Sequence, residues 1–347
     1  MTSDAAEYGV DIAALSEWMR GEHLAAGPVE VTEAISGGTQ NVLLRISADG
    51  AEYVLRRPPV NKKPRDDQTM RREMRLLAAL GKTDVPHPAF VAGCPDPDVL
   101  GAAFYLMRPL DAANPNVELP PPYAASAEWR HRLGLEVASA AARIGDVDFA
   151  AIGLSDFGRV DGYLDRQVER WLRQLKSYEV LDGYRSSQLP HVEVIAAWLD
   201  RNKPAGFAPG LIHGDFHLAN VMVERERPAI AGVIDWELST VGAPLIDLGW
   251  LLATWPDDDP HAPGVKGAEP WHGFPSPGEL VEQYARSSVR AVDDVEWYTV
   301  LACFKLGCIL EGTHARAQAG LVPAPRGERF RQAARNALRR AMTIIES

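Results

Sequence analysis

The stretch LIHGDFHLANVMV occupies residues 211–223, and AGVIDWE follows it at residues 231–237. In each stretch an apolar, strand-like run adjoins a cluster of polar side chains. A polar residue beside a short buried strand is held by a rigid scaffold that can aim it. These two segments are therefore where we expect the chemistry of the protein, and they decide which fold we predict.

The polar residues of these segments match the small set of groups that phosphoryl transfer requires. That reaction depends mainly on positioning and on the neutralisation of charge. Asp215 suits the carboxylate that accepts the proton of an attacking hydroxyl. Asp235 and Asn220 suit the carboxylate and amide oxygens that hold Mg²⁺ against nucleotide phosphates. A lone aspartate near an apolar strand is usually a cap or a surface charge, so the prediction rests on the combination.

The order and spacing of these residues resemble a known signature. HGDFHLAN, at 213–220, followed by VIDWE, at 233–237, looks like the H-G-D-x-x-x-x-N and I-D motifs of aminoglycoside phosphotransferases and their choline-kinase-like relatives. The chain looks closest to the branch related to kinase-like domains fused to acyl-CoA dehydrogenases, because its third predicted strand carries Leu-Arg at 55–56. The resemblance implies an α+β, two-lobed protein-kinase-like fold that uses ATP and Mg²⁺.

The resemblance also implies a role for each matching residue. Asp215 would be the catalytic base, and Asn220 and Asp235 would bind Mg²⁺. His213 would brace the catalytic loop, and Asp247, in GAPLIDLGWLL, would support the same loop without reacting. The protein would then be a small-molecule kinase, which transfers the γ-phosphate of ATP to a hydroxyl of a small substrate.

The N-terminal third of the chain follows the same resemblance. Three short strands, rich in β-branched and aliphatic residues, are expected at 31–35, 41–46 and 51–56. The turn between the first two stands where the family covers the nucleotide phosphates, and backbone N–H groups can cradle anionic oxygens there. The residues of this turn are Ser36, Gly37, Gly38 and Thr39. Taken alone, two glycines between strands more often make a plain hairpin.

Further nucleotide-binding residues are predicted in the same region. Arg56 stands where kinases carry a lysine in their third strand, and arginine binds phosphate as a fork rather than as a point charge. Glu73 lies on a helix predicted at 69–80, where it either pairs with Arg56 or is solvated. The strand predicted at 102–107 would lead into the hinge beside adenine, which places Met107 among the residues that bind the nucleotide.

A change of pattern near residue 109 predicts two lobes. Residues 1–108 are predicted to form an N-terminal nucleotide-binding lobe, with a mixed or antiparallel sheet and one inserted helix. Residues 109–347 are predicted to form a larger, mainly helical catalytic and substrate-binding lobe, with ATP bound between the two. Short strands are expected at 210–212 and 230–234. Helices of the second lobe are expected at 126–144, 161–176, 190–200, 279–290, 295–318 and 328–345.

The phosphate acceptor is the least determined part of the prediction. The irregular stretch 255–277, rich in Pro, Gly and Asp, is typical of a lid or a binding loop. Its acidic run, 257–259, either attracts a cationic aminoglycoside-like or choline-like substrate or is a solvated surface. The resemblance also favours a hydroxyacyl metabolite. The pattern does not determine the choice between ATP and GTP, the role of His217 or the oligomeric state.

The composition is that of a folded globular protein. The chain has 347 residues, of which 46% are hydrophobic and 24% charged, which suggests two domains or lobes. Its net charge of −11 argues against broad contact with nucleic acid. Three scattered cysteines suit core positions rather than disulfides: Cys94, Cys303 and Cys308. Neither a signal peptide nor an apolar run of about 18 residues is present, so a cytoplasmic protein that contacts no membrane is expected.

Two other functions compete with the kinase. His213, Asp215 and His217 alternate, so on a strand they would share one face and, with Asp235, form a metal-dependent hydrolase centre. That function leaves Asn220 and the N-terminal sheet unexplained. The second alternative is a catalytically inactive pseudokinase that only binds, which the arginine of the third strand suggests. The intact set of polar residues argues against a loss of catalysis.

Overall fold

The computed structural model describes residues 8–35, 41–259, 261–262 and 268–347. The chain divides into two compact units. Unit 1 comprises residues 1–112, 152–154 and 231–237, and unit 2 comprises residues 113–151, 155–230 and 238–347. The segment that carries Asp235 therefore belongs to the same unit as the N-terminal sheet. The lobe boundary at residue 108 stays a prediction.

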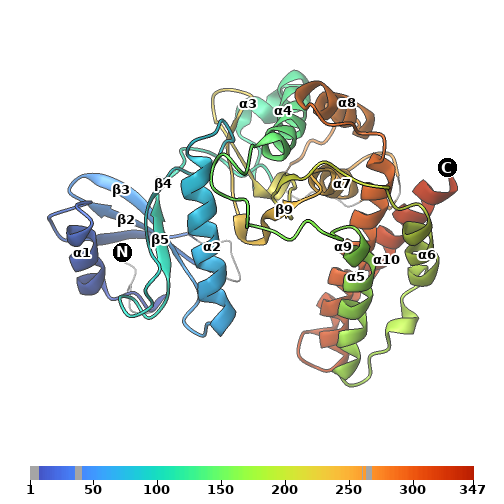
Figure 1. Ribbon diagram of the computed structural model, residues 1–347, viewed down its shortest axis with the longest axis horizontal. Coiled ribbons are helices and arrows are strands. Elements are labelled where there is room, and N and C mark those ends of the chain that lie inside the picture. Colours follow the sequence, from blue (N-terminus) through green and yellow to red (C-terminus); the bar gives the residue numbers. More distant parts are fainter. Residues whose placement is uncertain (1–7, 36–40, 260, 263–267) are drawn as a thin grey trace. The chain divides into compact units, whose positions relative to one another are not determined.

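Unit 1 is built on a five-stranded antiparallel sheet (Figure 1). The strand order is β1-β2-β3-β5-β4, so the first three strands form a meander and β5 pairs with β3. The bounds of the strands are β1 (Glu30–Ala34), β2 (Val42–Ala48), β3 (Ala51–Arg57), β4 (Phe90–Cys94) and β5 (Phe104–Met107). The small N-terminal sheet predicted from the sequence is thus confirmed, although β4 was not foreseen.

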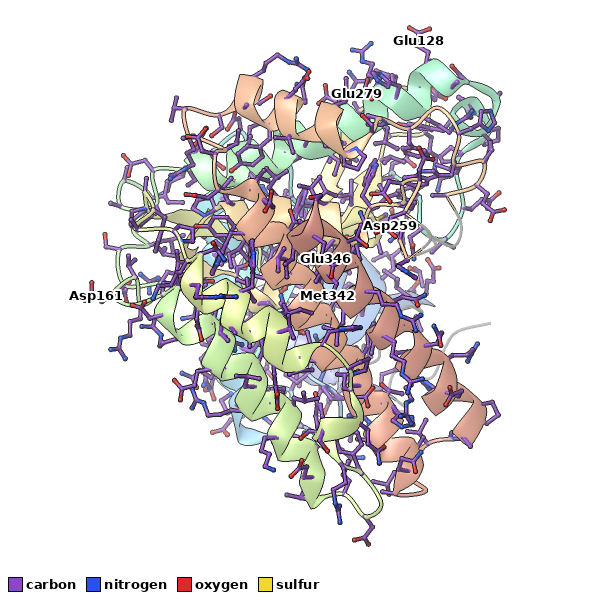
Figure 2. The ribbon with its side chains drawn as sticks, turned by 90° about the vertical axis from the view of Figure 1, so that its right-hand side faces the viewer. Glu128, Asp161, Asp259, Glu279, Met342 and Glu346 are labelled. Carbon is purple, nitrogen blue, oxygen red and sulfur yellow. The ribbon has the colours of Figure 1, made fainter. Side chains whose placement is uncertain are left out.

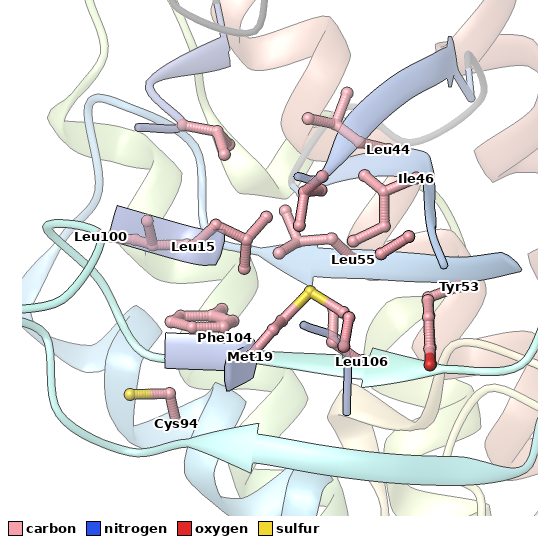
Figure 3. Close-up of a cluster of buried hydrophobic side chains, with 14 residues drawn as sticks. Leu15, Met19, Leu44, Ile46, Tyr53, Leu55, Cys94, Leu100, Phe104 and Leu106 are labelled. Atoms are coloured by element: carbon pink, nitrogen blue, oxygen red, sulfur yellow. The ribbon is translucent and has the colours of Figure 1, made fainter. Parts of the chain in front are cut away.

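Side chains alternate between the two faces of the sheet along β3 and β5, so one face packs in the core and the other carries Arg56. Leu55 lies opposite Leu106 in the ladder, and both side chains are fully buried in a hydrophobic cluster with Leu15 of helix α1 (Ile12–Gly21) (Figure 3). Successive side chains of a strand point to opposite faces. Arg56, which lies opposite Tyr105, therefore projects from the other face of the sheet.

Two helices in the described part of unit 1 begin where side-chain carboxylates accept backbone N–H groups. Asp11 accepts from two N–H groups of the first turn of α1. Helix α2 (Pro64–Leu80) begins five residues before the predicted start at residue 69. The carboxylate of Asp66 accepts the Lys63 N–H at 2.7 Å and stabilises this extra turn.

Unit 2 is mainly helical, as predicted. Its short strands are β6 (Gly210–Ile212), β7 (Val221–Val223) and β9 (Thr240–Gly242). Strands β6 and β9 pair antiparallel. Strand β8 (Ile230–Val233) spans the unit boundary. Its helices are α3 (Pro121–Ala125), α4 (Ala127–Asp146), α5 (Asp165–Ser177), α6 (Val192–Arg201), α7 (Leu245–Thr254), α8 (Pro277–Ser287), α9 (Val295–Gln318) and α10 (Ala324–Glu346).

Helix α9 is the centre of unit 2. It packs against α5, α7 and α10, and most of its first four turns is buried (Figure 1). Helices α4 and α8 lie side by side in another part of the unit, where His131 and Glu279 are 2.9 Å apart (Figure 2). This packing fixes α7 and α9 as a rigid frame beside the loop that follows β6.

Several elements of unit 2 differ from the predictions. Helix α7 was missed because it is apolar on nearly every side, so its sequence has no amphipathic period. Helix α3 was not predicted from its proline-rich stretch, and it is anchored by the fully buried Tyr123. Helix α5 begins at Asp165, four residues after the predicted start.

Other structural expectations can be compared directly. The described part of residues 255–276 contains neither helix nor strand, as predicted. All three cysteines are unpaired and buried, in agreement with their assignment to the core. Among the described residues, no helix combines the length and the apolar character needed to cross a bilayer.

Candidate active site

The loop after β6 turns sharply at a glycine. Gly214 has a φ of +85°, a left-handed conformation that L-residues with a side chain rarely adopt. A Cβ atom at this position would lie 2.6 Å from the carbonyl oxygen of Leu238. Both facts require glycine here, and the turn places Asp215 directly after it.

Asp247 holds this turn from the first turn of α7. Its Oδ2 accepts the backbone N–H of His213 at 2.6 Å, and its Oδ1 accepts that of Gly214 at 2.8 Å. The side chain is almost fully buried, and burial raises the pKa of Asp247 to about 6 against the opposing effect of the two N–H groups. The residue predicted to support the loop therefore contacts the backbone of that loop.

Asp215 is oriented by its own neighbours in the loop. The Nδ2 atom of Asn220 donates to the backbone carbonyl of Asp215 at 2.9 Å and to its Oδ2 at 3.2 Å. The backbone N–H of Asp215 donates to Nδ1 of the fully buried His213 at 3.3 Å. Nε2 of His217 lies 3.5 Å from the Asp215 carboxylate, whose side chain is 28% exposed.

The charge of Asp215 is set by two opposing effects. Burial raises the pKa of its carboxyl group. His217, through its hydrogen bond and charge, and Lys305, through its positive charge, together lower this pKa by more than burial raises it. The net pKa is below the ordinary value. Asp215 is therefore an ionised carboxylate at neutral pH, which is the state that can accept a proton.

Lys305 was not foreseen from the sequence. It extends from α9, and its Nζ donates to the carbonyl oxygen of Gly214 at 2.8 Å. The ammonium also lies 3.9 Å from the centre of the Trp250 ring. A single lysine inside the apolar run VLACFKLGC was the signal available, because charged side chains are rare in buried helices.

A second group of charged residues lies on the sheet of unit 1. Arg56 donates from Nε to Glu73 at 3.1 Å, and from Nη2 to Asp235 at 2.9 Å. Arg56 is 7% exposed and Glu73 is 2% exposed, so this is a buried ion pair. Burial raises the pKa of Glu73, and the neighbouring guanidinium opposes that rise. The predicted pairing of Glu73 with Arg56 is confirmed.

Asp235 has a strained backbone. Its φ is +66°, which is uncommon for a residue other than glycine and costs about 1–3 kcal/mol. Upstream, the N–H of Val233 donates to the Pro86 carbonyl at 2.9 Å, so the segment is tied to unit 1. The side chain of Asp235 is 40% exposed. Strain of this kind is often retained at functional positions.

Glu237 completes the acidic side of this group. It lies 3.8 Å from Nη2 of Arg56 and accepts a hydrogen bond from Asn41 at 3.2 Å. One guanidinium is therefore surrounded by three carboxylates, those of Glu73, Asp235 and Glu237. Burial lowers the pKa of Arg56, but Glu73, Tyr105 and Asp235 together raise it above its ordinary value.

The side chains predicted to bind Mg²⁺ have the donor atoms that this cation prefers. Mg²⁺ is a hard cation and takes oxygen ligands. In Asn220 the amide nitrogen is used by Asp215, which leaves the side-chain oxygen as the atom that could bind a cation. Asp235 offers a partly exposed carboxylate. The chemistry of these residues thus fits Mg²⁺.

The remaining predicted residues are placed as follows. Met107 ends β5 opposite Val54, on the same face of the sheet as Arg56 and Tyr105. The predicted phosphate-covering turn, Ser36, Gly37, Gly38 and Thr39, lies outside the described residues. The nucleotide-binding role of all these residues stays a prediction.

The metal-dependent hydrolase centre considered as an alternative is contradicted by the structure. Residues 213–217 are a loop with a left-handed glycine, not a strand, so His213, Asp215 and His217 do not alternate on one face. Within the described residues, no group of three or more His, Cys, Asp or Glu side chains is arranged to hold a metal. In the acidic run 257–259, Asp257 forms a salt bridge of 2.6 Å with Arg340, whereas Asp258 is exposed.

Sequence comparisons agree with this geometry. Residues 31–284 match the family described as Phosphotransferase enzyme family. The chain is 31% identical over 313 residues to IBR3 of Arabidopsis thaliana, a candidate acyl-CoA dehydrogenase. That match covers 85% of this chain but 36% of IBR3, so the chain spans about a third of its relative. Other curated relatives include acyl-CoA dehydrogenase family members 10 and 11.

Solved structures show the same fold. A candidate aminoglycoside phosphotransferase from Ralstonia eutropha superposes with a TM-score of 0.79 and 29% identity, over 96% of this chain and 99% of that one. Choline kinase from Cryptosporidium parvum gives a TM-score of 0.58 at 14% identity, over 97% and 96% of the two chains. The α+β, protein-kinase-like fold predicted from the sequence is confirmed.

Proposed function

The chain belongs to the phosphotransferase enzyme family, and from this premise we propose that it is a kinase for a small hydroxylated molecule, with Mg·ATP as the phosphoryl donor. The observation that carries the proposal is the double hydrogen bond from Asn220 to Asp215. It joins the proposed base to a proposed metal ligand in one loop. A kinase requires these two functions in one place.

Asp215 is the proposed catalytic base. Its lowered pKa keeps the carboxylate ionised, so it can accept the proton of the substrate hydroxyl. The hydroxyl oxygen forms a bond to the γ-phosphorus, the bond from that phosphorus to the bridging oxygen breaks, and ADP leaves with the bonding electrons. Asn220 keeps the carboxylate of Asp215 in one orientation during this step.

Individual residues are proposed for each part of the nucleotide and its metal ion. We propose Asn220 and Asp235 as the residues that hold Mg²⁺, which supplies neutralisation of phosphate charge when bound. Arg56, positioned by Glu73, is the proposed cation for the α- and β-phosphates. Met107 and the turn 36–39 are the proposed contacts to the rest of the nucleotide.

For the acceptor we place a hydroxyacyl compound first. The chain is similar to part of proteins named as acyl-CoA dehydrogenases, which favours an acyl metabolite over an antibiotic. Aminoglycoside-like and choline-like acceptors follow, since proteins with those names share the fold. The salt bridge of Asp257 with Arg340 removes one of the acidic residues that would have attracted a cation.

The test is release of ADP from Mg·ATP, with Mg·GTP in parallel, across hydroxyacyl-CoAs, choline-like alcohols, sugars and aminoglycosides. We expect turnover that depends on one acceptor class. The variant Asp215→Asn should lower kcat by about 10²–10⁴-fold, because it removes the base without changing the shape of the side chain. Asp182→Asn, at an exposed loop position, is the matched control and should leave kcat unchanged.

Other results would change the assignment. If Mg·ATP binds in a thermal-shift assay but no acceptor causes turnover, the pseudokinase that only binds nucleotide becomes the better description. If neither binding nor turnover is found, the proposed function is wrong. Undiminished turnover in Asp215→Asn would remove Asp215 from the mechanism.

A further inference from the structure

The peptide group between Gly214 and Asp215 is held at both ends. Its carbonyl oxygen accepts the Lys305 ammonium at 2.8 Å, and its N–H donates to His213 at 3.3 Å. The preceding N–H, that of Gly214, donates to Asp247 at 2.8 Å. Partners from α7 and α9 thus fix the orientation of the backbone from which the Asp215 side chain projects.

Lys305 is held in place by aromatic rings. Its ammonium lies 3.9 Å from the centre of the Trp250 ring on α7 and 5.6 Å from that of Trp171 on α5. Cations are attracted to the faces of such rings. Lys305 is therefore confined by three helices, which leaves the hydrogen bond to Gly214 little freedom to rearrange.

The charge of Lys305 lies between two carboxylates. Asp215 and Asp247 raise its pKa, while burial, which is the larger effect, and Arg170 lower it, so that the pKa of Lys305 is about 8. The ammonium is thus mostly protonated at pH 7. In that state its positive charge reduces the repulsion between the two carboxylates on either side of the turn.

Packing alone gives no reason for a lysine at this position. A buried charge is frequently replaced by an apolar residue of similar volume with little loss of stability. A methionine would fit the long apolar surface of α9 and would keep contact with the Trp250 ring. The feature that methionine cannot supply is the hydrogen bond from a charged donor to the Gly214 carbonyl.

We propose that Lys305 is a positioning residue for phosphoryl transfer, which fixes the Gly214–Asp215 peptide so that the Asp215 carboxylate stays aimed at the acceptor hydroxyl. This inference rests on the proposed function for its kinetic consequence. Its structural consequence, an ordered turn at residues 213–216, can be measured whether or not the acceptor is known.

The test compares Lys305→Met and Lys305→Arg with the native protein. Lys176→Met is the matched control, because Lys176 is 72% exposed on the same unit. In Lys305→Met we expect kcat to fall roughly 10–100-fold, with the KM for ATP within about threefold and the unfolding temperature nearly unchanged. Hydrogen exchange of a peptide that spans 213–216 should become at least about tenfold faster. Lys305→Arg should recover part of both losses.

The pH profile gives a further readout. The kcat of the native protein should fall as the pH rises through about 8, because Lys305 loses its proton there. Arginine stays charged at every accessible pH, so this alkaline fall should be absent in Lys305→Arg. A purely structural role for Lys305 would not move a pH profile in this way.

The failure of the inference and the failure of the proposed function are distinguishable. If the native protein turns over and Lys305→Met keeps kcat within twofold, Lys305 does not position the base. If the native protein shows no turnover at all, the proposed function fails. Hydrogen exchange alone then tests whether Lys305 orders the turn at residues 213–216. Unchanged exchange at 213–216 in Lys305→Met overturns the inference, and faster exchange supports it.

Discussion

Arg56 donates a hydrogen bond of 2.9 Å to Asp235, which lies 179 positions further along the chain. The same guanidinium donates to Glu73 through a different nitrogen, so one side chain links the sheet, helix α2 and the strained segment after β8. Lysine, with a single nitrogen, would not match this fork. Arginine in the third strand therefore fits the geometry of this site better than lysine would.

The buried pair makes a prediction about stability. Arg56→Met should lower the free energy of unfolding by roughly 3–5 kcal/mol, because Glu73 is left buried without a cation. The double variant Arg56→Met/Glu73→Gln should lose clearly less unfolding free energy than the single variant. Urea denaturation measures both. The exposed pair of Arg45 and Glu52, at 3.5 Å, is the control, and Arg45→Met should cost no more than about 1 kcal/mol. Equal losses in the single and double variants would contradict the prediction.

Asn220 should control the response to Mg²⁺. In Asn220→Ala we expect the Mg²⁺ concentration for half-maximal turnover to rise about tenfold or more, because a ligand oxygen is lost. The kcat should fall as well, since Asp215 loses two hydrogen bonds. Titration of Mg²⁺ at saturating ATP measures the effect. The exposed Asn202→Ala serves as the control, and an unchanged Mg²⁺ response in Asn220→Ala would exclude Asn220 as a ligand.

Glu311 should make the stability of unit 2 depend on pH. Its side chain is 1% exposed on α9, and burial raises its pKa from 4.5 to about 7. Between these values the folded state binds more protons than the unfolded state, so the free energy of unfolding should fall as the pH rises from about 4.5 to 7. Glu311→Gln removes this dependence and should be the more stable protein at pH 8, by roughly 1–3 kcal/mol.

Chemical denaturation at several pH values tests this prediction. The exposed loop variant Glu226→Gln is the matched control and should keep the native pH dependence. If Glu311→Gln shows the same decline between pH 4.5 and 7 as the native protein, another group is responsible for the decline.

Alanine variants of Gly214 and Gly320 separate the cost of backbone strain from the cost of a steric clash. Both have positive φ, of +85° and +72°, but a Cβ at Gly320 meets nothing within 4 Å, whereas one at Gly214 meets the Leu238 carbonyl at 2.6 Å. Gly320→Ala should cost about 1 kcal/mol of unfolding free energy. Gly214→Ala should cost more and should also abolish turnover, because the turn before Asp215 must move. If thermal unfolding shows the same loss of stability in the two variants, the structure around Gly214 has shifted to remove the clash.

Much of the fold and site could be predicted because short-range patterns encode them. Short apolar runs predicted β1, β2, β3 and β5, and helical spacing predicted α9 at residues 295–318, which are the bounds in the structure. Asp215 and Asn220 are five residues apart, so their place in one loop follows from the chain itself. The pairing of Arg56 with Glu73 could be predicted because helix α2 follows β3 closely.

What the sequence could not reveal depends on contacts between distant segments. Helix α7 has no amphipathic period, since packing covers nearly all its sides. The salt bridge of Asp257 with Arg340 joins positions 83 residues apart.

The sequence by itself thus determined the family and many of the strands and helices, and it indicated the proposed reacting groups, because these depend on local spacing. The tertiary structure decided which neighbours set their charge and orientation. Lys305 reaches Gly214 across 91 positions, and Asp235 joins the unit of the N-terminal sheet. Local patterns carry no information about such distances, because packing of whole elements brings these side chains together.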